Sequence, residues 1–148
     1  MANMNILEDL ARTTFDSIEG YSKAAEKAND PDLKRQLQEH AQRRHATLNK
    51  LNAEIETAGG ASVQEGSVKG SLHRVWLDID SAFANGDEAA AERVEEGEDY
   101  LARKFSEALD SHLDASTRTT VQECFDEICN GETFGDIIAS RYDQGDPD

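Results

Sequence analysis

Apolar residues return every three or four positions through most of the chain, the spacing that places them on one face of an α-helix. Turn-forming residues interrupt this pattern at Asp30 and Pro31, from Gly59 to Gly70, around Gly86 and at 114–116. The segments between the interruptions are 6–28, 32–58, 71–84, 88–113 and one that begins near 117. The pattern therefore predicts an all-α protein with four long helices and a short one.

The spacing of the interruptions also predicts how the helices are connected. Tight turns join the first two long helices and the last two, whereas 59–87 forms a long connection that carries the short helix 71–84, with Trp76 as its anchor. This layout is typical of a ferritin-like four-helix bundle with one long crossover. We expect a single domain at 1–142, a weak point in the last helix at Gly131, and a disordered acidic tail at 143–148.

The charge of the chain argues against nucleic acids and anionic membranes as partners. The 148 residues contain 15 Lys and Arg against 31 Asp and Glu, a formal net charge of −16. Such a field repels nucleic-acid phosphates and anionic lipid surfaces. No apolar run approaches the roughly twenty residues of a membrane span, and the first residues do not resemble an export signal. We expect a cytoplasmic protein that binds neither nucleic acid nor membranes, with Cys124 and Cys129 reduced.

Several polar residues fall on or beside the apolar faces of the four long helices. Ferritin-like di-iron proteins direct Glu side chains and Glu-x-x-His pairs into the bundle, because iron and similar cations bind carboxylate oxygens and imidazole. Counting residues from each tight turn gives the candidates a common height, so we predict that they converge on one internal layer. The candidates are Glu19, Gln42, His45, Glu98 and Glu127, with Glu132 as a weaker addition.

These residues allow two interpretations. As metal ligands, Glu19, His45, Glu98 and Glu127 could hold iron, manganese or zinc, although Gln42 and Asn130 stand where a di-iron site would have Glu and His. As structural residues, they would pack their stems at the helix seams and pair with Arg43 or Arg44. Glu98 lies in the middle of its apolar face and needs a metal or a buried cation as partner. His40 is expected to be a core histidine with its hydrogen bonds satisfied.

Four short segments carry a resemblance to a known family. They are Ile-Glu-Gly-Tyr at 18–21, Asn-Asp-Pro-Asp-Leu-Lys at 29–34, the stretch from Gly-Ser-Val to His-Arg-Val-Trp at 66–76, and Glu-Gly-Glu-Asp at 96–99. Over about 6–128 the chain resembles a bacterial family of ferritin-like four-helix-bundle proteins, a domain of unknown function. The resemblance implies the fold but no activity, substrate or cofactor.

Two functional hypotheses follow. The first, which we favour, is a non-catalytic helical module with an inward polar layer, compatible with a homodimer and with the stress-related role that the family context suggests. The second is a metal-binding ferritin-like protein. Haem binding is a distant third hypothesis, because the chain has no Cys-x-x-Cys-His motif.

Overall fold

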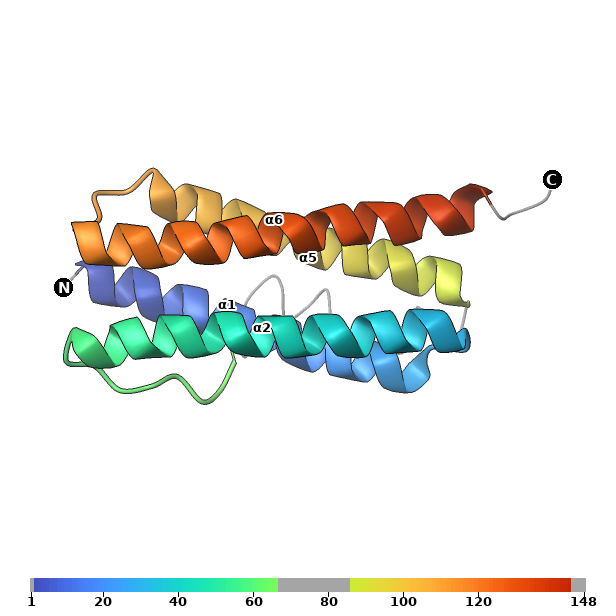
Figure 1. Ribbon diagram of the computed structural model, residues 1–148, viewed down its shortest axis with the longest axis horizontal. Helices are drawn as coiled ribbons and strands as arrows, with labels where there is room; N and C mark the ends of the chain where they lie inside the picture. Colours follow the sequence, from blue (N-terminus) through green and yellow to red (C-terminus); the bar gives the residue numbers. More distant parts are fainter. Residues whose placement is uncertain (1, 67–85, 145–148) are drawn as a thin grey trace.

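The described part of the chain folds into four helices. The computed structural model describes residues 2–66 and 86–144, with side chains in the last helix described as far as residue 129. The helices are α1 (Ala2–Lys27), α2 (Pro31–Thr57), α5 (Asp87–Leu109) and α6 (Ala115–Gln144), and these described ranges contain no strand (Figure 1). The prediction of an all-α protein is confirmed. The predicted short helix at 71–84 with Trp76 lies outside the described residues.

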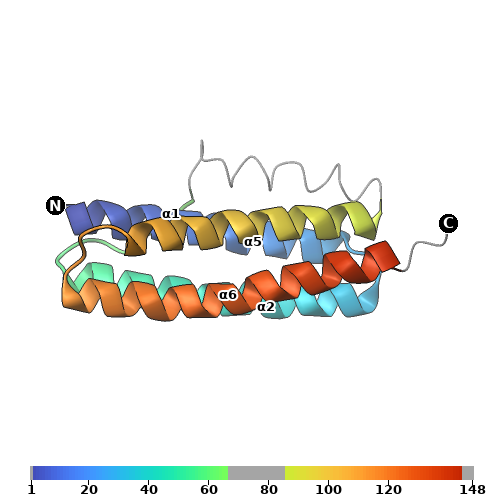
Figure 2. The same cartoon turned by 90° about the horizontal axis from the view of Figure 1, so that it is seen from above.

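The four helices form two antiparallel hairpins, α1 with α2 and α5 with α6 (Figure 1). Between the hairpins, α1 packs beside α5 and α2 packs beside α6, which the view from above in Figure 2 also shows. The tight turns of the two hairpins lie at opposite ends of the bundle. Because α1 and α2 are antiparallel, α2 ends near the start of α1. α5 begins at the other end of the bundle, beside the turn between α1 and α2 (Figure 1).

Polar side chains from one hairpin hold the turn of the other. Asp30 caps α2 by accepting a hydrogen bond from the Asp32 amide at 3.0 Å, and Pro31 fits the first turn of that helix. The Asp87 carboxylate of α5 accepts hydrogen bonds from the Asn29 and Asp30 amides at 3.0 and 2.9 Å. At the other end, Asn3 of α1 accepts a hydrogen bond from the Asp114 amide at 3.1 Å. These contacts fix the hairpins against each other along the bundle axis.

The last helix differs from the expectation in two respects. α6 runs without interruption from Ala115 to Gln144, through the predicted weak point at Gly131 and past the predicted start of the tail at 143. A glycine costs only about 1 kcal/mol relative to alanine inside a helix. The helical residues on both sides are sufficient to carry the helix across it.

Leucine, alanine and other apolar side chains fill the centre of the bundle, but the largest fully buried side chain among those described is Arg44. Long charged side chains are almost never fully buried unless they are paired. We therefore expect a charged partner for Arg44 among the buried polar groups around it. No helix among the described residues is both long enough and apolar enough to cross a membrane.

Candidate functional site

The structure separates the predicted site residues by burial. Glu98 is 1% exposed and lies in the core, and Glu127 is partly buried. The side chains of Glu19, Gln42 and His45 are exposed, so the expectation that these three face the interior is wrong. The side chains of Asn130 and Glu132 lie outside the described residues.

Helical geometry explains why these residues face outward. At about 100° per residue, His45 is displaced by about 80° from the direction of Leu37 in the centre of the buried face, and Gln42 by about 140°. Arg44 is displaced from Leu37 by only about 20°. On α1, Glu19 is displaced by about 160° from the fully buried Tyr21 and so turns away from the core. Arg44 therefore takes the inward place at the height where the sequence analysis expected His45.

Arg44 and Glu98 form an ion pair in the core. Arg44 Nη2 lies 2.8 Å from Glu98 Oε2, and Arg44 Nε donates to Oε1 at 3.4 Å. The two side chains are 0% and 1% exposed. The Tyr21 hydroxyl also donates a hydrogen bond to Glu98 Oε1. Three helices, α1, α2 and α5, thus contribute one side chain each to a buried cluster, which we call the Tyr21–Arg44–Glu98 layer.

His40 extends this layer by one helical turn. Its ring stacks on that of Tyr21, with 5.9 Å between the centroids and 25° between the planes. Burial, together with the positive charges of Arg44 and Arg43, lowers the pKa of His40 to about 4. His40 is therefore neutral near pH 7 and packs as a core aromatic ring, in agreement with the expectation of a core histidine.

Burial and the ion pair also determine the protonation states of Tyr21 and Arg44, the two groups that donate hydrogen bonds to Glu98. Burial, reinforced by the negative charge of Glu98, raises the pKa of Tyr21 well above its ordinary value. Burial alone would lower the pKa of Arg44, but the charge of Glu98, with smaller contributions from Tyr21, the hydrogen bond to Glu98 and the charge of Glu127, together raises that pKa. Tyr21 thus stays a neutral phenol and Arg44 stays a cation. Neither group is close to the pKa that a general acid or base needs near neutral pH.

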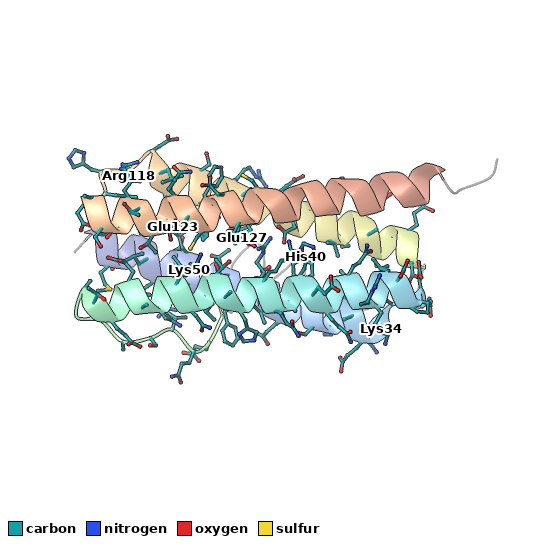
Figure 3. The ribbon with its side chains drawn as sticks, in the orientation of Figure 1. Lys34, His40, Lys50, Arg118, Glu123 and Glu127 are labelled. Carbon is teal, nitrogen blue, oxygen red and sulfur yellow. The ribbon has the colours of Figure 1, made fainter. Side chains whose placement is uncertain are left out.

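The fourth helix approaches the same layer with Cys124 and Glu127. The negative charge of Glu127 contributes to the raised pKa of Arg44, and Figure 3 places Glu127 and His40 between α6 and α2. Cys124 is 0% exposed, and burial raises the pKa of its thiol to about 11. At neutral pH this thiol is protonated and shielded, which makes it a poor nucleophile and a poor metal ligand.

A metal ion needs several donor side chains close together. Among the side chains that the structure describes, no three His, Cys, Asp or Glu lie close enough together to hold a metal. Gln42 and His45 instead line an open groove of about 510 Å³ on the outer face of the α1–α2 hairpin. Metal binding by Glu19, His45, Glu98 and Glu127 stays a prediction, and it would require Glu98 to exchange Arg44 for the metal.

From the sequence, Arg44 was expected only as a partner at a helix seam. Its spacing nevertheless predicts a buried position, because Arg44 comes three residues after Ala41 and four before Leu48, both buried. The same spacing rule that selected Glu98 on α5 therefore selects Arg44 on α2. A carboxylate and a guanidinium in the middle of two apolar faces indicate a buried ion pair.

The comparisons with known proteins bear on the same helices. Residues 2–111 match the model of a family described as a domain of unknown function, DUF2383. Neither the curated proteins nor the solved structures contain a match to this chain. The matched segment spans α1, α2 and α5 and hence all three members of the Tyr21–Arg44–Glu98 layer. Because it covers well over half of the sequence, the chain belongs to the DUF2383 family.

Proposed function

We propose that this protein is a non-catalytic helical module with the topology of a ferritin-like bundle, in which an internal ion pair stands where a metal centre would otherwise lie. The observation that carries the proposal is the contact between Arg44 and Glu98, both without access to solvent. A buried carboxylate needs a cation, and here the protein's own guanidinium meets that need.

The ends of the helices support the ferritin-like topology. α2 ends at one end of the bundle and α5 begins at the other (Figure 1), which supports a long connection between the two hairpins. A long crossover between two antiparallel hairpins is the arrangement that distinguishes ferritin-like bundles from up-down bundles with short loops.

The position of the layer supports a structural role. Arg44 belongs to one hairpin and Glu98 to the other, and Tyr21 adds a contact from the first hairpin to the same carboxylate. A sliding movement of one hairpin by a single helical turn would leave both charges buried and unpaired, at a cost of several kcal/mol. The layer thus selects one alignment of the hairpins. The protonation of its members suits such a role better than turnover of a substrate.

A module of this kind would act through its surface. With a net charge of −16, the chain presents a strongly acidic exterior on a helical bundle. This field favours basic proteins or cations as partners and keeps the protein soluble. We place the function in the class of scaffold or interaction proteins.

Thermal unfolding in the presence and absence of metals tests the proposal. Wild type and Glu98→Gln are each measured with iron, manganese or zinc and with a chelator, and Glu92→Gln, an exposed position on α5, serves as the matched control. We expect melting temperatures that do not depend on the metal, and a clear loss of stability in Glu98→Gln, which leaves Arg44 as a buried cation without its charged partner. The metal-binding alternative predicts a rise for wild type, about 2.7 kcal/mol at a hundredfold excess over the dissociation constant, which Glu98→Gln abolishes. That result would overturn the proposal.

A further inference from the structure

Two buried polar atoms of the α1–α2 hairpin have no hydrogen-bond partner among the described residues, and one of them belongs to the ion pair. They are Ser17 Oγ and Arg44 Nη1, in side chains that are 1% and 0% exposed. Buried polar groups in folded proteins are nearly always hydrogen-bonded, and the rare exceptions carry a cost in stability. These two atoms therefore require a partner that the neighbouring side chains do not provide.

Ser17 differs from the three buried threonines of α1 and α2 in the bonding of its hydroxyl. The hydroxyls of Thr13, Thr14 and Thr47 each donate to the carbonyl oxygen four residues earlier in their own helix, at 2.7 to 3.2 Å. This bond back to the helix is the usual solution for a hydroxyl inside a helix. Ser17 does not make it. Its hydroxyl is thus left for a partner inside the bundle.

The register of the α1–α2 hairpin brings Ser17 and Arg44 to the same height. The stacked rings show that Tyr21 on α1 faces His40 on α2. In an antiparallel pair, one turn towards the start of α1 corresponds to one turn towards the end of α2. Ser17 lies one turn before Tyr21 and Arg44 one turn after His40. The two atoms without partners therefore occur at one level, beside the Glu98 carboxylate.

We propose that an internal water molecule is bound between Ser17 Oγ and Arg44 Nη1 and completes the Tyr21–Arg44–Glu98 layer. Nη1 carries N–H donors and no acceptor, so the water oxygen accepts from it. The water in turn donates a hydrogen bond to Ser17 Oγ. Two to four polar partners are what a buried water needs, and proteins contain roughly one such water per 27 residues.

The charges around Arg44 select a neutral molecule over an anion. Glu98 already balances the guanidinium charge at 2.8 Å, and the negative charge of Glu127 also acts on Arg44. A bound anion would add a further negative charge to a buried site whose cation is already compensated. Water satisfies the donors without changing the charge.

Replacement of Ser17 by alanine gives opposite results with and without the water. If the water is bound, Ser17→Ala removes one of its partners, and we expect the melting temperature to fall by about 3 °C for a domain of this size. If no water is bound, the substitution removes an unsatisfied buried hydroxyl, and the melting temperature should stay unchanged or rise. Ser22→Ala, an exposed position on the same helix, corrects for the helix propensity of alanine. A value for Ser17→Ala equal to or above that of Ser22→Ala would overturn the proposal.

A high-resolution crystal structure provides a direct test of the same site. We expect an ordered water within hydrogen-bonding distance, roughly 2.7–3.2 Å, of both Ser17 Oγ and Arg44 Nη1. A direct bond from Nη1 to the Glu127 carboxylate would contradict the proposal. So would a bond from the Ser17 hydroxyl back to the Thr13 carbonyl.

Discussion

Replacement of Arg44 by methionine tests how much the buried ion pair contributes to folding. Methionine keeps much of the length of the side chain but removes the cation, so that Glu98 retains only the Tyr21 hydroxyl among the partners described above. Since both members of the pair are fully buried, solvent cannot take over the role of the guanidinium. Removal of one partner from a buried ion pair costs about 3–5 kcal/mol.

The expected loss can be converted into a melting temperature. An unfolding entropy of about 2.1 cal/mol/K per residue gives about 0.3 kcal/mol/K for a chain of this length, so Arg44→Met should lower the melting temperature by roughly 10–16 °C. Calorimetry or circular dichroism at neutral pH measures this shift. Arg43→Met is the matched control, because Arg43 is the exposed neighbour on the same helix and should change stability by no more than about 0.5 kcal/mol.

A double variant separates the loss of the cation from the loss of packing. When Glu98→Leu is added to Arg44→Met, no buried charge is left, and apolar replacements of buried ion pairs are often neutral or stabilising. We therefore expect the double variant to recover most of the stability lost by the single one. If Arg44→Met costs less than about 1 kcal/mol, or if the double variant is less stable than the single one, the reasoning is wrong.

Three further predictions concern the groups around the pair. Tyr21→Phe keeps the ring but removes the hydrogen bond to Glu98, so urea unfolding should show a loss of about 1.5–3 kcal/mol; an unchanged midpoint would contradict this. His40 titrates at about 4 in the folded state and near 6.5 when unfolded, so the unfolded state takes up the proton first and stability should fall as the pH drops from 6.5 towards 4. This fall should be smaller in His40→Gln, and equal slopes for the two proteins would refute it. Cys124, with a pKa of about 11, should not react with a thiol reagent at pH 7.5 in folded Cys129→Ser protein, whereas rapid labelling would show that the core opens there.

The helices themselves were determined by the local sequence. The period of the apolar residues and the capping residues Asp30 and Pro31 specify where α1 ends and α2 begins, because these are interactions within a few residues of the chain. The same reasoning identified Glu98 as a buried carboxylate that needs a partner. It was less successful at Gly131, where the small local penalty of glycine does not interrupt α6.

The identity of the partner of Glu98 was decided by the tertiary structure. Arg44 and His45 are adjacent, and both stand three or four residues from Ala41 and from Leu48, so the spacing of apolar residues does not distinguish them. His45 was named as the candidate because imidazole is a metal ligand. An arginine is normally assigned to the surface because its charge is costly to bury alone. That cost is removed only when α5 brings Glu98, 54 residues away, against Arg44. A contact of this kind depends on the packing of two hairpins, which no local pattern in either helix contains.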